Sequence, residues 1–101
     1  MSRVVVQLEG EDGLVAIPIE DVLDLHPFRP GETASVVAEY VAAAAAKGFR
    51  EVRLIHGRGI GVQRAIVRTT LERSSLVTSF EDATPERGGW GATVVRLTCG
   101  P

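Results

Sequence analysis

The chain has only one cysteine, one tryptophan and one tyrosine among its 101 residues, and it has no excess of positive charge. A single cysteine, Cys99, cannot form an internal disulfide or a Cys-based zinc site, so we expect a reducing compartment and a cytoplasmic protein. The net charge of −2 gives no overall attraction to a polyanion. Binding of nucleic acid would therefore need a local cluster of positive charge.

Long hydrophobic runs are also missing. No apolar run approaches the ~20 residues that a membrane-spanning helix needs, and residues 1–4 do not open a signal peptide. We therefore expect a soluble protein with no membrane partner. The 101 residues fit one domain, and 45% hydrophobic residues supply a core without a metal or a disulfide.

The first part of the chain contains two runs rich in β-branched residues, at 4–8 and 14–17, separated by acidic residues and glycines. This pattern predicts a β-hairpin or an extended arm over residues 1–18, ahead of a main domain at 19–101.

The main domain alternates between strand-like and helix-like patterns. Strands are predicted at residues 22–26, 51–56, 76–80 and 91–97, and helices at about 32–47 and 60–73. The first helix should bury Val36, Val37, Tyr40, Val41 and Ala44. The second should bury Ile60, Val62, Ile66, Val67 and Leu71. The order β-α-β-α-β-β predicts an α/β fold, a two-layer α+β sandwich with a mixed four-stranded sheet.

Both histidines follow predicted strands. His26 ends the first strand of the main domain and His56 ends the second, and ligands of such sheets collect at the carboxyl ends of parallel strands. Asp24 and His26 lie two residues apart, so they should point to the same side of their strand and the carboxylate could orient the imidazole. Alternatively, Asp24 hydrogen-bonds a neighbouring loop and His26 is a partly buried loop residue.

A glycine-rich loop follows the second strand. Gly57, Gly59 and Gly61 have the spacing G-x-G-x-G, which is neither the dinucleotide motif nor a P-loop, so no nucleotide cofactor is indicated. Backbone N–H groups at a helix start, together with the Arg58 guanidinium, suit a phosphate group. Arg64 and Arg68, one helical turn apart, could extend this phosphate track. A tight structural turn would also need glycines, and that alternative stays open.

Trp90, between two glycines, could stack on a nucleic-acid base, but we favour a packing role. Glu81, Asp82 and Glu86 are expected in the preceding loop, as solvated residues.

The ordered segments "LDLH" (23–26), "IHGRGIG" (55–61) and "GGWGATVVRL" (88–97), separated by two amphipathic helices, resemble the small MutS-related (Smr) domain. The resemblance spans residues 19–97 and implies the fold of the C-terminal domain of bacterial translation initiation factor three. It also implies a stand-alone protein that nicks DNA or RNA, or a non-catalytic module that binds nucleic acid. One departure is that Pro27 and Phe28 follow the first motif, where the family commonly has glycine.

The resemblance assigns the cleavage chemistry to Asp24 and His26, and His56 joins them as a candidate catalytic residue. The candidate phosphate-binding residues are Gly57, Arg58, Gly59, Gly61, Arg64 and Arg68. Histidine can donate or accept a proton near neutral pH, as phosphodiester cleavage requires.

No cofactor is established by the sequence. A weakly bound divalent cation such as magnesium stays open, although the chain lacks the carboxylate cluster of a two-metal nuclease. A small phosphate-ligand or protein-interaction domain is the third reading, which the acidic net charge favours.

Overall fold

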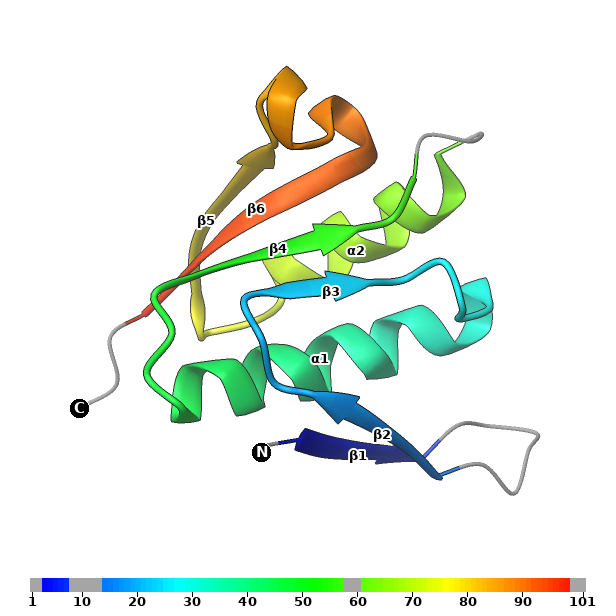
Figure 1. Ribbon diagram of the computed structural model, residues 1–101, viewed down its shortest axis with the longest axis vertical. Helices are drawn as coiled ribbons and strands as arrows, with labels where there is room; N and C mark the ends of the chain where they lie inside the picture. The colour runs from blue at the N-terminus through cyan, green and yellow to red at the C-terminus, as the bar shows by residue number, and fades with distance from the viewer. Residues whose placement is uncertain (1–2, 8–13, 58–60, 99–101) are drawn as a thin grey trace.

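A computed structural model describes residues 3–7, 14–57 and 61–98 of the chain (Figure 1). Its strands are β1 (Arg3–Gln7), β2 (Leu14–Pro18), β3 (Val22–Asp24), β4 (Glu51–Ile55), β5 (Val77–Asp82) and β6 (Ala92–Leu97). Its helices are α1 (Pro30–Ala46) and α2 (Val62–Glu72). Two single-turn 3-10 helices, η1 (Pro85–Arg87) and η2 (Gly89–Gly91), connect β5 to β6.

The main sheet is mixed, as predicted. Its strand order is β3-β4-β6-β5, with β3 parallel to β4 and β6 antiparallel to both of its neighbours. The parallel pair follows from the helical crossover α1, and the antiparallel pair β5–β6 follows from the short connection between these strands. The fold is the predicted two-layer α+β sandwich, with both helices on one face of the sheet (Figure 1).

The core lies between the sheet and the helices. Alternate residues of β4, Val52 and Leu54, point into it and are almost fully buried. The predicted face of α1 is confirmed, because Val36, Val37, Tyr40, Val41 and Ala44 are all buried. A second, smaller apolar cluster lies on the other face of the sheet and contains Ile55, Ala83, Ala92 and Val94.

The apolar face of α2 is narrower than predicted. Val67 and Leu71 are buried, but Ile66 is only half-buried and Val62 is 42% exposed, so the prediction that these two pack in the core is wrong. Each helical residue advances by ~100°, which places Val62 about 140° around the helix from Val67 and on the opposite side from the sheet. Ile60 lies outside the described residues.

The N-terminal segment forms the predicted antiparallel hairpin, β1–β2. It packs against α1 (Figure 1), and Ile17 of β2 is part of the main core. The Tyr40 hydroxyl donates a hydrogen bond to the Glu20 carbonyl and so ties α1 to the chain between β2 and β3. Neither helix of the described segments is long and apolar enough to cross a membrane.

Candidate nucleic-acid interface

The two strands that precede the histidines are adjacent and parallel, as expected. Asp24 pairs in register with Ile55, and the Leu25 N–H extends this ladder by donating to the Ile55 carbonyl at 2.8 Å. His26 and His56 therefore leave the same edge of the sheet. Leu23 and Leu25 point into the core, so Asp24 and His26 face the side of the sheet that carries no helix.

Asp24 and His26 form a pair, which confirms the expectation from their spacing. Oδ1 of Asp24 accepts hydrogen bonds from the His26 backbone N–H at 2.9 Å and from Nδ1 of its ring at 2.6 Å. Because a carboxylate only accepts, the proton of the neutral ring lies on Nδ1 and the lone pair lies on Nε2. The backbone hydrogen bond from His26 is the main cause that lowers the pKa of Asp24 below 3.8. His26 is an exposed residue and is not partly buried as the alternative supposed, since 60% of its side chain is accessible.

Gly57 lies directly against the His26 ring. Its backbone has φ of +79°, and a Cβ atom there would stand 2.8 Å from Nε2 of His26. Both observations disfavour a side chain at position 57, which would strain the backbone and displace the His26 ring. Glycine at position 57 thus leaves Nε2 of His26 uncovered. This explanation for a glycine at this position could not be obtained from the sequence.

His56 occupies a different environment from His26. It is only 5% exposed, its Nδ1–H donates to the Gly57 carbonyl at 2.9 Å, and its Nε2 accepts from the Thr93 hydroxyl at 2.9 Å. Burial is the main cause that lowers its pKa below 6.5, so the ring is neutral. Both ring nitrogens of His56 thus have partners, and one of these partners is the carbonyl of Gly57.

The turn at Pro27 and Phe28 is anchored on the helices. The Phe28 N–H donates to the Leu25 carbonyl at 3.0 Å, and its own carbonyl accepts from Nε2 of Gln63 at 3.0 Å. Gln63 in turn accepts a hydrogen bond from the Thr33 hydroxyl. The Phe28 ring packs against the core. Pro27 and Phe28, where this chain departs from the family motif, therefore turn the chain away after His26. They leave the His26 ring exposed.

A hollow of about 410 Å³ lies beside the pair, on the helix-free face. It is lined by Arg53, Ile55, Gly57, Glu86, Arg87, Gly88, Gly91 and Ala92. Arg53 donates to the Arg87 carbonyl at 2.8 Å, while its buried Nε has no partner among the described residues. These two arginines are positive groups that the sequence reasoning missed. Alternation along β4 places Arg53 on the same face as Ile55 and could have revealed it, whereas Arg87 depends on the turn η1.

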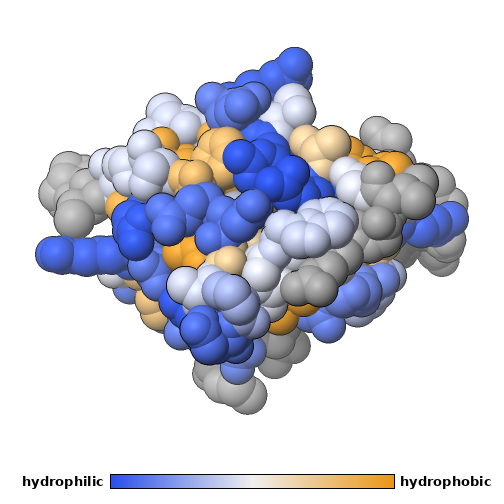
Figure 2. Space-filling view, turned by 90° about the horizontal axis from the view of Figure 1, so that it is seen from above, coloured by the Kyte–Doolittle hydropathy of each residue, from blue (hydrophilic) through white to orange (hydrophobic). Residues whose placement is uncertain are grey.

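Arg64 and Arg68 are held by an acidic partner. The Asp82 carboxylate lies 2.8 Å from Arg64 and 3.5 Å from Arg68. Glu81 and Asp82 are the last two residues of β5, so the prediction that they lie in the following loop is wrong. Each guanidinium also lies over an aromatic ring, Arg64 over Trp90 and Arg68 over Phe80. The end of the molecule near η1 and η2 is largely covered by hydrophilic side chains with hydrophobic patches between them (Figure 2).

Trp90 is 44% exposed, contrary to the packing role that we favoured. Arg58 and Gly59, two of the candidate phosphate-binding residues, lie outside the described residues, as does Cys99. Gly61 precedes α2 with φ of +84°. Among the residues placed by the structure, no three His, Cys, Asp or Glu side chains gather to hold a metal ion.

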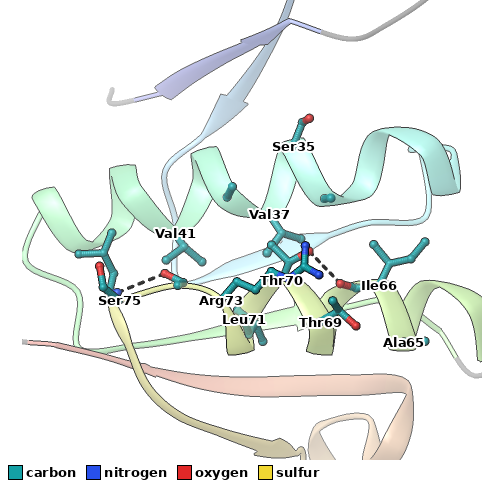
Figure 3. Close-up of a pocket in the computed structure, with 14 residues that line it drawn as sticks. Ser35, Val37, Val41, Ala65, Ile66, Thr69, Thr70, Leu71, Arg73 and Ser75 are labelled. Carbon is teal, nitrogen blue, oxygen red and sulfur yellow. Dashed lines mark hydrogen bonds between the residues drawn. The ribbon is translucent and has the colours of Figure 1, made fainter.

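A larger groove, of about 790 Å³, lies between α1 and α2 (Figure 3). Apolar side chains such as Val37, Val41 and Leu71 line it, together with serines and threonines. It opens on the helical layer, so it is separate from the Asp24–His26 pair.

The fold and the paired motifs at the strand ends define a class of small α+β domains, and comparison with known proteins gives the family. The model of the Smr domain matches residues 23–98, and the chain therefore belongs to the Smr domain family. A relative named endonuclease MutS2, from Thermus thermophilus, is 40% identical over 93 residues, which cover 88% of this chain and 12% of the relative. The chain thus spans about an eighth of that relative's length.

Two solved structures share the fold. The Smr domain of Thermus thermophilus MutS2 has a TM-score of 0.75 and 38% identity, and the match covers 78% of this chain and 99% of that domain. YdaL, a stand-alone small MutS-related protein from Escherichia coli, has a TM-score of 0.73 and 30% identity, covering 79% of this chain and 66% of YdaL.

Proposed function

We propose that this Smr domain binds DNA or RNA and nicks it by hydrolysis of a phosphodiester bond, with Asp24 and His26 as the proton-transfer pair. The observation that carries the proposal is the 2.6 Å contact between Asp24 Oδ1 and His26 Nδ1 at an exposed sheet edge. The relatives named endonuclease MutS2 support the reaction class.

In this proposal, Nε2 of His26 accepts a proton from the attacking water as the new P–O bond forms. Asp24 keeps the other ring proton on Nδ1 and stabilises the imidazolium that results, because its lowered pKa keeps it ionised at neutral pH. The bond from phosphorus to the leaving oxygen then breaks, that oxygen takes up a proton from water, and the His26 imidazolium returns its proton to solvent.

The phosphate would lie over Gly57, next to Nε2 of His26. Arg53 and Arg87 border the adjacent hollow and provide positive charge for the non-bridging oxygens, although Arg87 also lies 3.6 Å from the Glu51 carboxylate. Arg58, on the sequence pattern, is the further candidate for this contact. Arg64 and Arg68 fit this role less well, since Asp82 already neutralises part of their charge.

Conversion of supercoiled plasmid to the open circular form, and cleavage of a structured RNA, test the proposal. Each substrate is incubated with the protein in magnesium and in chelator, so that metal dependence is read in the same experiment. We expect nicking of at least one substrate. Binding without cleavage of either would reject the nuclease and leave a nucleic-acid-binding module.

A further inference from the structure

Trp90 is presented to solvent by a rigid turn. Gly88 and Gly89 have φ of +114° and +56°, and a Cβ atom at Gly88 would stand 3.0 Å from the Ala92 Cβ. The Gly89 N–H donates to the Thr84 carbonyl at 2.9 Å, and the Gly91 N–H donates to the Gly88 carbonyl at 3.1 Å. The backbone is therefore fixed on both sides of an indole that is 44% exposed.

A basic side chain lies beneath the ring. The Arg64 guanidinium lies 5.9 Å from the ring centroid and is itself anchored by Asp82 at 2.8 Å. Because the turn already fixes the backbone at Trp90, less conformational freedom is left to lose there when a ligand binds. The indole therefore presents an aromatic surface, and Asp82 offsets part of the charge of the guanidinium beneath it.

This surface is connected to the proposed cleavage site. The Gly91 carbonyl, one residue from Trp90, accepts hydrogen bonds from the N–H groups of His56 at 3.1 Å and Gly57 at 2.8 Å. Gly57 lies against Nε2 of His26. The turn that carries Trp90 is thus bonded to the residue over which the phosphate would lie.

We propose that Trp90 stacks on an unpaired base of the nucleic acid, so that the preferred substrate has unpaired nucleotides beside the cleaved bond. In a continuous duplex both faces of a base are covered by its neighbours, whereas an unpaired base offers a face to an aromatic ring. The inference rests on the proposed function for the position of the phosphate, and it names the class of substrate.

Intrinsic fluorescence tests the proposal directly, because Trp90 is the single tryptophan of the chain. The whole protein is titrated with an unpaired oligonucleotide and with a blunt duplex of the same sequence, each as DNA and as RNA. We expect quenching by the unpaired strand and little change with the duplex, and the DNA and RNA arms show which backbone is preferred.

Anisotropy of labelled oligonucleotides then measures the variants. Trp90→Ala should weaken binding of the unpaired strand by roughly 5- to 150-fold, and Trp90→Phe should restore part of that loss. The salt dependence should not change, because no phosphate contact is removed. Val5→Ala is the matched control, since Val5 is also apolar and 53% exposed but lies on β1.

Stacking is overturned if the unpaired strand binds without quenching, if the duplex quenches equally, or if Trp90→Ala binds as the parent does. These outcomes are separate from nicking. A parent protein that nicks while Trp90 shows no quenching contradicts only the stacking, and quenching without nicking contradicts only the nuclease.

Discussion

Gly57→Ala separates the geometry at His26 from ordinary backbone strain. An alanine at φ of +79° costs about 1–2 kcal/mol of folding free energy. Its Cβ would also stand 2.8 Å from Nε2 of His26, so the exposed imidazole must swing away and lose its 2.6 Å hydrogen bond to Asp24. Since general acid–base catalysis contributes about 10²- to 10⁴-fold, nicking should fall by a factor in that range.

Gly48→Ala is the matched control. Gly48 has φ of +91°, and a Cβ atom there would meet nothing within 4 Å. Both variants should unfold at a temperature about 4–16 °C below the parent, while Gly48→Ala keeps its nicking rate. Thermal unfolding and initial nicking rates, measured on the same preparations, give the comparison. Equal nicking by the two variants would refute the idea that Gly57 is required to keep Nε2 uncovered.

Three further predictions concern the buried histidine and the basic residues. Thr93→Val removes the hydroxyl that donates to Nε2 of His56, so urea unfolding should show a loss of about 1–3 kcal/mol, and an unchanged midpoint would contradict this. Because burial lowers the pKa of His56, the unfolded chain binds a proton below pH 6.5 that the native chain does not. The free energy of unfolding should therefore be highest above pH 6.5 and decline as the pH falls towards the lower pKa of the folded state. The decline should be less steep in His56→Gln. Arg58→Ala should flatten the slope of log affinity against log salt by roughly 0.7–0.9. Arg68→Ala should leave that slope unchanged, because Asp82 already holds the Arg68 guanidinium. The opposite ranking of the two variants would reverse these assignments.

Local patterns were sufficient to predict the fold. The change between a period of two and a period of 3.6 residues located the strands and helices, and the helical crossover determined that β3 and β4 are parallel. The Asp24–His26 pair could be predicted for the same reason, because residues two apart on a strand share a side.

Features that depend on distant contacts could not be predicted in this way. The burial of His56 depends on Thr93, which is 37 residues further along the chain. Asp82 neutralises arginines that belong to a different element, and the exposure of Trp90 depends on two glycine turns and on Arg64. The hollow at Arg53 and Arg87 likewise exists only once η1 has folded over the sheet.

The central claim is tested most directly by measuring nicking rate and nucleic-acid affinity together for His26→Ala and Asp24→Asn. Both side chains are exposed, at 60% and 58%, so neither substitution removes core packing. We predict that each variant folds and binds nucleic acid as the parent does but loses nicking by at least about 10²-fold. Nicking at the parent rate by either variant would contradict the role of the Asp24–His26 pair.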